Sequence, residues 1–179
     1  MIELSLPLQL DKISNNIEYK FNLSIVYLLL NNYQIGLTLY EKRLLEKDNS
    51  KVIASPKLIK CEHKPKEGDQ LLIVSEQGFG DTVQFMRYVI YLQTKGVDIS
   101  FCAQEKLHSL IKSSTTNLPI IAPKEIDLIK QGKWLPLLSL PKCLGVCPEN
   151  PIVNQPYLFP NDQLIQKWRT IFSLETKPI

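Results

Sequence analysis

The spacing of apolar residues changes once along this chain of 179 residues, and that change constrains the fold more than any other feature of the sequence. Up to about residue 50 the spacing is helical, as in Tyr33, Leu37, Tyr40 and Leu44, which follow one another at intervals of four, three and four. After residue 70, short apolar runs alternate with helical stretches. The first part therefore predicts packed helices, and the second predicts an α/β domain of three layers with a mainly parallel sheet.

Residues 1–50 predict a helical hairpin. Residues 21–30 are apolar almost all round, and a helix of this kind requires partners on more than one side. Asn31 and Asn32 interrupt the pattern, and a second helical stretch follows. Residues 51–69 contain two prolines and no strong periodicity, so they predict a linker between the hairpin and the domain formed by residues 70–179.

Strands and helices are expected to alternate in residues 70–179. The expected strands are 71–74, 97–103, 119–121 and 134–138, and the expected helices are 79–95, 105–113, 139–147 and 161–172. In the last helix Asn161 is the expected N-cap, with a buried stripe at Leu164, Ile165, Trp168 and Ile171.

The turn after the first of these strands, residues 75–82, contains the residues most suited to chemistry. Its glycines, Gly78 and Gly80, permit positive φ and a close backbone approach. Asp81 follows them, and two interpretations remain open: a helix cap that accepts backbone N–H bonds, or a general base at the mouth of a cleft. A dinucleotide site is disfavoured, because Val83 stands where the third glycine of that pattern belongs.

Glu76, just before the turn, is a weaker candidate for a general base. The alternative for this residue is a carboxylate that faces solvent or pairs with Arg87.

Composition excludes several functions. The net charge is only +3, from 21 basic and 18 acidic residues, and three of the basic residues are arginines, so no nucleic-acid-binding surface is expected. The four cysteines have irregular spacings, which predicts free thiols in a reducing cytoplasm and no metal site. The first residues lack the pattern of a signal peptide, and no apolar run approaches the roughly 20 residues of a membrane span.

The stretch that begins at Leu71 resembles bacterial tetratricopeptide-repeat proteins that carry a glycosyltransferase-like domain, related to O-GlcNAc transferases and heptosyltransferases of the GT-B fold. The residues that match are Glu76, Gln77, Gly78, Gly80, Asp81, Thr82, Gln84, Phe85, Arg87 and Tyr88, while Phe79 replaces the usual leucine. A second block, residues 137–141 followed by 156–158, is also similar.

The predicted hairpin resembles a single tetratricopeptide repeat. Residues at the expected offsets are Leu23, Ser24, Tyr27, Gly36 and Tyr40. Glycine at position 36 would let the two helices approach closely. The sequence departs from the repeat at Lys20, where tryptophan is preferred, and at Asn31, where glycine is preferred.

The resemblance implies that residues 70–179 form one Rossmann-like half of a GT-B fold, the acceptor-side half. It implies that Asp81 is a base or orients the acceptor, that Gly78 and Gly80 shape the turn, and that Thr82, Gln84 and Arg87 line or support the site. No donor-binding half is recognised, so the expectation is a partial or truncated glycosyltransferase-like protein that is inactive alone and requires a missing donor domain. The alternative is a non-catalytic module whose hairpin binds a protein partner. Binding of a nucleotide sugar would separate the two, and no cofactor is expected.

Overall fold

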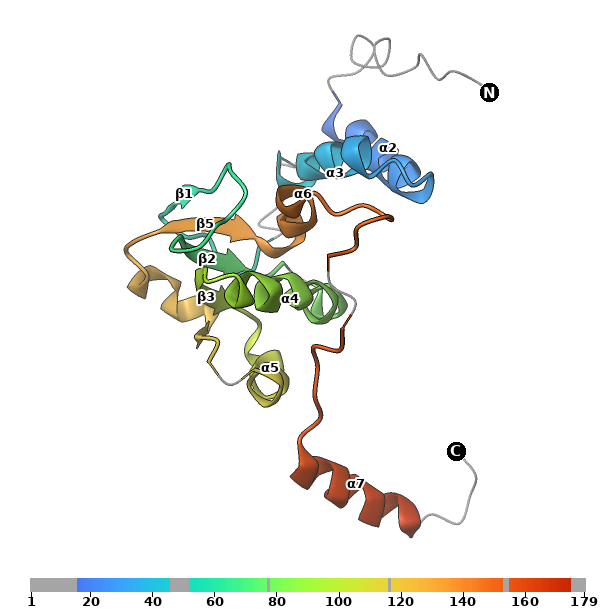
Figure 1. The fold of residues 1–179 in the computed structure, drawn as a ribbon, viewed down its shortest axis with the longest axis vertical. Coiled ribbons are helices and arrows are strands. Elements are labelled where there is room, and N and C mark those ends of the chain that lie inside the picture. Colours follow the sequence, from blue (N-terminus) through green and yellow to red (C-terminus); the bar gives the residue numbers. More distant parts are fainter. Residues whose placement is uncertain (1–15, 46–51, 77, 116, 153–154, 175–179) are drawn as a thin grey trace.

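The computed structural model describes residues 16–45, 52–76, 78–115, 117–152 and 155–174. A helical hairpin, an α/β body and a C-terminal helix follow one another along the chain (Figure 1). Gln77 of the turn, and the parts of the predicted hairpin before Asn16 and after Leu45, lie outside the described residues.

The hairpin consists of α2 (Ile17–Leu29) and α3 (Tyr33–Tyr40), followed by the 3-10 helix η1 (Glu41–Leu45). The Asn32 side chain caps α3 by accepting a bond of 3.3 Å from the Ile35 amide. Asn31 has a φ of 60°, a conformation that asparagine tolerates better than most residues, which explains its presence where glycine would be preferred. The two helices predicted for this part of the chain are therefore present.

Gly36 lies where α3 packs closely against Leu28 of α2. A Cβ atom at this position would be 2.8 Å from Cγ of Leu28 and 3.1 Å from its backbone nitrogen. Glycine at position 36 thus allows the close approach that the sequence predicted.

The sheet has five parallel strands in the order β1-β5-β2-β3-β4, so the predicted parallel sheet is confirmed. The strands are β1 (Ile59–Lys60), β2 (Gln70–Val74), β3 (Asp98–Cys102), β4 (Ile120–Ile121) and β5 (Lys133–Pro136). The central strand β2 is buried from Leu71 to Val74, as expected for a parallel strand that is covered on both faces.

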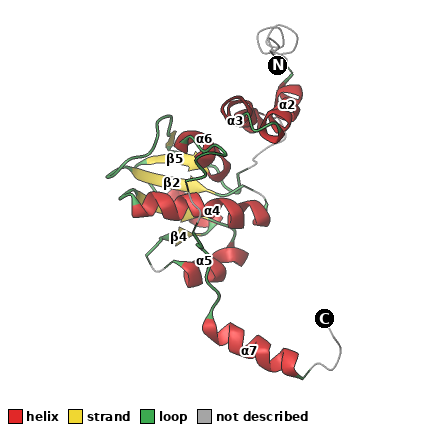
Figure 2. Cartoon of the chain, turned by 45° about the vertical axis from the view of Figure 1, so that its right-hand side comes forward, coloured by secondary structure: helices red, strands yellow, loops and turns green. Residues whose placement is uncertain are grey.

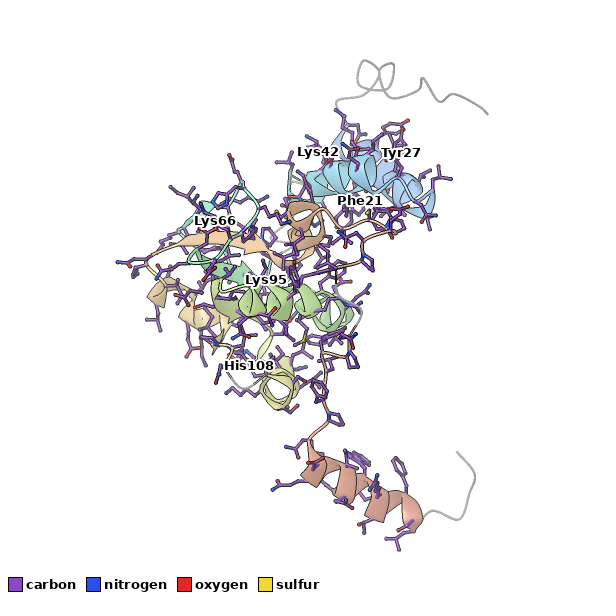
Figure 3. All side chains as sticks on the ribbon, viewed as in Figure 1. Phe21, Tyr27, Lys42, Lys66, Lys95 and His108 are labelled. Atoms are coloured by element: carbon purple, nitrogen blue, oxygen red, sulfur yellow. The ribbon has the colours of Figure 1, made fainter. Side chains whose placement is uncertain are left out.

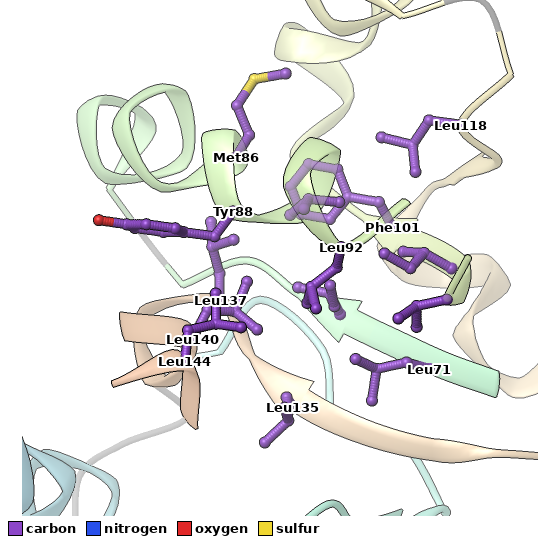
Figure 4. Packing of buried hydrophobic residues seen from close by; sticks show 14 of the residues in the cluster. Leu71, Met86, Tyr88, Leu92, Phe101, Leu118, Leu135, Leu137, Leu140 and Leu144 are labelled. Atoms are coloured by element: carbon purple, nitrogen blue, oxygen red, sulfur yellow. The ribbon is translucent and has the colours of Figure 1, made fainter. Parts of the chain in front are cut away.

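Helices cover one face of the sheet: α4 (Phe79–Thr94), α5 (His108–Ser114) and α6 (Leu140–Leu144). Side chains of β2 and β3, among them Leu71 and Phe101, pack in one cluster with Leu92 of α4 (Figure 4). On the other face, Leu72 packs with residues that include Ile126 of the 3-10 helix η3 (Pro123–Leu128). The sheet is therefore the middle of three layers.

Part of the predicted linker belongs to this body. Strand β1 lies within residues 51–69 and pairs with β5, and Val52 forms an isolated bridge with Glu76. Two residues are too short a strand to produce a recognisable alternation in sequence.

Helix α7 (Asp162–Ser173) begins at the predicted N-cap, where the Asn161 side chain accepts bonds from the Gln163 and Leu164 amides at 3.0 and 3.2 Å. The predicted burial of its apolar stripe is wrong. Trp168 is 51% exposed, and the helix stands apart from the sheet (Figures 1 and 2). The apolar spacing specifies an amphipathic helix, but it does not determine which surface covers the apolar face, and among the described residues that face stays largely exposed.

Across the described ranges, none of the helices combines the length and the apolar character needed to cross a membrane.

Candidate functional site

The strand order reverses at β2. The chain passes from β2 to its neighbour β3 and then to β4 at the edge on that side, and it later enters β5 on the other side of β2. In open α/β sheets, ligands bind outside the carboxyl ends of the strands at such a switch point. Here that region is formed by the turn that follows β2 and by the 3-10 helix η4 (Leu137–Ser139) that follows β5.

The glycines of the turn do not act as predicted. Gly78 is the N-cap of α4 in extended conformation, with φ −75° and ψ 125°, and neither Gly78 nor Gly80 has a positive φ. The helix starts immediately at Phe79, so no left-handed residue is needed. A Cβ atom at Gly78 would collide with Oδ2 of Asp81, whereas one at Gly80 would meet nothing within 4 Å. Gly78 therefore makes room for the Asp81 carboxylate.

Asp81 lies in the first turn of α4 and is exposed. Its carboxylate makes no hydrogen bond to any described residue, and no side chain caps this helix. The interpretation of Asp81 as a cap that is bonded to backbone amides is therefore not supported by the geometry. The carboxylate is free to accept a hydrogen bond from a ligand.

Glu76 is buried, with 4% of its surface exposed, and it pairs with Arg43 of η1. Arg43 donates from Nε to Oε2 at 2.9 Å and from Nη2 to Oε1 at 2.7 Å, and the Leu138 amide donates to Oε1 at 3.3 Å. The expectation that Glu76 faces solvent or pairs with Arg87 is wrong. With both oxygens engaged inside the protein, Glu76 is not accessible to a substrate hydroxyl.

A second carboxylate, Glu41, completes this buried cluster. Glu41 Oε1 accepts from Arg43 Nη1 at 2.9 Å and from the Ser139 hydroxyl at 2.8 Å, and Glu41 Oε2 accepts from Lys60 Nζ at 3.3 Å. We refer to Glu41, Arg43, Lys60, Glu76 and Ser139 as the Arg43 network. Its two cations balance its two carboxylates, and it joins the hairpin to the segments that follow both β2 and β5.

The Arg43 network shifts the ionisation of its members. Burial alone would favour the neutral form of Glu41, but the Arg43 guanidinium, hydrogen bonds from Arg43 and Ser139, and the Lys60 ammonium outweigh it and lower the pKa of Glu41. Burial likewise opposes the charge of Arg43, but Glu76 and Glu41 outweigh it and raise the pKa of Arg43. The folded state therefore favours the charged form of both groups.

Acid should destabilise the protein through Glu41. Because its pKa is lower in the folded state than its ordinary value of 4.5, the stability that it contributes is complete above that value and is lost as the pH falls through the folded-state pKa. The urea midpoint should therefore decrease between about pH 5 and pH 3. A Glu41→Gln variant should show a smaller decrease. Equal pH dependence in both proteins would contradict this assignment.

Tyr40 lies against the Arg43 network. The Arg43 guanidinium lies 4.5 Å from the centre of the Tyr40 ring. Burial raises the pKa of Tyr40, the positive charge of Arg43 opposes this, and the charges of Glu76, Asp81 and Glu41 add to it. The hairpin thus places the Tyr40 phenol beside the buried ion pairs of the Arg43 network.

Thr82 stabilises the turn through hydrogen bonds of its side chain. Its buried hydroxyl lies 3.1 Å from the Gly78 carbonyl oxygen and 2.9 Å from Oε1 of Gln104. Gln104 in turn donates to the carbonyl oxygen of Glu76 at 2.7 Å. Thr82 therefore fixes the start of α4 and is not exposed to a ligand.

Arg87 and Gln84 lie further along α4. The Arg87 guanidinium lies 4.8 Å from the centre of the Tyr157 ring and donates to the Tyr157 hydroxyl at 3.1 Å and to the Gln84 carbonyl oxygen at 2.8 Å. The side chain of Gln84 is exposed. Arg87 thus holds the segment around Tyr157 against α4, and it forms no hydrogen bond or ion pair with Asp81.

The sequence did not predict Arg43 or Tyr40 as site residues. Arg43 stood out only as one of three arginines, and Tyr40 only as a position of the repeat. Within the described part of the chain, no group of three or more His, Cys, Asp or Glu side chains could hold a metal ion.

Comparison with protein-family models, with curated proteins and with solved structures finds no match for this chain. The resemblance to glycosyltransferase-like proteins therefore rests on the residues of the sequence alone.

Proposed function

We propose that this chain is the acceptor-side half of a glycosyltransferase-like protein of the GT-B class, and that Asp81 binds the hydroxyl group of the acceptor. The observation that carries this proposal is the exposed carboxylate of Asp81, which makes no hydrogen bond to the described residues and lies in the first turn after the central strand, at the switch point. Ligands in α/β sheets bind at this kind of position.

In the proposed reaction, Asp81 accepts the proton of the acceptor hydroxyl while its oxygen attacks the anomeric carbon of a nucleotide sugar. The bond between the sugar and the nucleotide diphosphate breaks, and the diphosphate leaves with its electron pair. The described residues contain a single five-stranded sheet, and its glycine-containing turn carries an acidic residue where a phosphate would be repelled. Binding of the donor therefore requires a second half, from the same polypeptide or from another chain.

The first experiment is calorimetry with UDP-sugars and ADP-sugars. We expect no measurable binding to these 179 residues alone, and binding once a donor half is supplied. Micromolar binding to the chain alone would place the donor site in this half. It would contradict the proposal that the donor binds to a second half.

A second candidate function is a protein-interaction module, and the apolar surface of α2 favours it. Ile25, Val26, Leu29 and Leu30 are all exposed, Leu29 to 78%. A helix with such a surface would pack on another helical repeat or on a partner. If a donor half restores neither nucleotide-sugar binding nor transfer, the interaction module becomes the better description.

A further inference from the structure

We propose that the groove between the hairpin and the α/β body binds a small amphiphilic carboxylate, an aliphatic chain with a single acidic head. This site goes beyond the function proposed above, because Asp81 is not among the residues that line the groove. It also differs from the groove beside α7, which is lined by residues of α5 and α7.

The volume of the groove and its apolar lining are typical of a small-molecule site. Its volume is about 690 Å³, within the range of roughly 300–1,000 Å³ that is typical of ligand pockets. Its apolar wall is formed by the partly exposed side chains of Leu39 and Leu44 from the hairpin side and of Cys143 from the body, and Cys61 and Leu135 lie buried beneath it. An aliphatic chain placed there would exchange contact with water for contact with these groups.

Ammonium groups surround this apolar lining. Lys42, on the hairpin (Figure 3), and Lys64 and Lys142, on the body, line the groove, and none of the three has an ion pair with a described residue. Lys60 and Glu41, which also line it, are already paired with each other. Glu62 contributes one further negative charge, so the unpaired lysines leave the rim positive.

The types of residue that line the groove indicate which class of anion it can bind. Among the described residues that line the groove the one aromatic ring is the His63 imidazole, whose nitrogens already lie 3.1 Å from the Lys64 carbonyl oxygen and 2.9 Å from Lys133 Nζ. No Phe, Tyr or Trp side chain lines the groove, so a nucleotide base would lack a large ring to stack against. No arginine lines it either, so the bidentate donors that favour a phosphate are missing from this wall. An aliphatic wall with separate ammonium groups suits an aliphatic carboxylate best.

Titration with decanoate, below the concentration at which it forms micelles, tests the proposal on the complete chain. We expect saturable binding of one decanoate per chain, and binding weaker by about tenfold in a Lys42→Gln/Lys142→Gln variant, because the charges of the half-buried Lys42 and the exposed Lys142 are removed. Lys112→Gln, a change at an exposed lysine of α5, is the matched control and should bind normally. The uncharged analogue 1-decanol should bind more weakly than decanoate.

Alkylation of the cysteines locates the ligand. Cys143 lines the groove and Cys147 does not, and both are partly exposed. Burial, together with the charge of Glu41, raises the pKa of Cys143 to about 11, so alkylation should be followed by mass spectrometry at alkaline pH. We expect decanoate to slow the modification of Cys143 and not that of Cys147.

Three results would overturn the proposal. The first is the absence of saturable binding, and the second is equal affinity in the double-lysine variant and in Lys112→Gln. The third is equal protection of the two cysteines, which would place the ligand elsewhere, for example beside α7. Circular dichroism of each variant verifies that the lysine substitutions leave the fold intact.

Discussion

Replacing Arg43 with methionine should lower the free energy of unfolding by about 3–5 kcal/mol, the usual cost of removing one partner from a buried ion pair. Methionine retains much of the side-chain volume but removes every donor, so Glu76 would keep a buried charge with only the Leu138 amide as partner. Urea unfolding followed by circular dichroism measures the effect. Such a loss is a large fraction of the 5–15 kcal/mol typical of domain stability.

Two further variants distinguish the cost of leaving a buried charge unpaired from the cost of removing any arginine. An Arg43→Met/Glu76→Gln variant removes both charges while the glutamine can still accept from the Leu138 amide, so it should recover part of the lost stability. Arg169→Met, on the exposed helix α7, should change the stability by less than about 0.5 kcal/mol. If Arg43→Met behaved like Arg169→Met, the Arg43 network would not contribute to stability as inferred.

Replacing Asp81 with asparagine should abolish sugar transfer in an enzyme reconstituted with a donor half. General-base catalysis typically contributes about 10²–10⁴-fold, and the amide of asparagine cannot take the proton of the acceptor hydroxyl. Folding should be nearly unaffected, because the Asp81 carboxylate bonds to no described residue. Transfer is measured from the release of the nucleotide, and folding from the urea midpoint.

Asp162→Asn is the matched control, since Asp162 is an exposed aspartate in the first turn of α7. It should leave transfer unchanged. Full activity in Asp81→Asn would remove this residue from the proposed mechanism. A large loss of stability would instead assign Asp81 a structural role.

Elements whose signals are local could be predicted well from the sequence. Helix α4 was expected at residues 79–95 and occupies Phe79–Thr94, because its apolar period and the glycine that follows it lie within one short segment. The buried strand β2 was recognised from its continuous apolar run. The N-cap of α7 was recognised from Asn161 and the helical period that follows it.

Features that depend on distant segments could not be predicted. The partner of Glu76 is Arg43, 33 residues away, and no spacing rule connects them. Arg87 was the nearest arginine in the sequence, but it lies against Tyr157. The burial of α7 was misjudged for a related reason, because its apolar face carries no information on what covers it.

The Arg43 network also determines how late in synthesis its last hydrogen bonds can form. Its members are far apart in the chain: Arg43 and Ser139 are separated by 96 residues, and Glu41 and Ser139 by 98. Because the ribosome makes the N-terminal part first, the hairpin emerges long before the segment that contains Ser139. Until then Glu41 and Arg43 lack the Ser139 hydroxyl, so the complete Arg43 network can form only after β5 and the segment that follows it have been made.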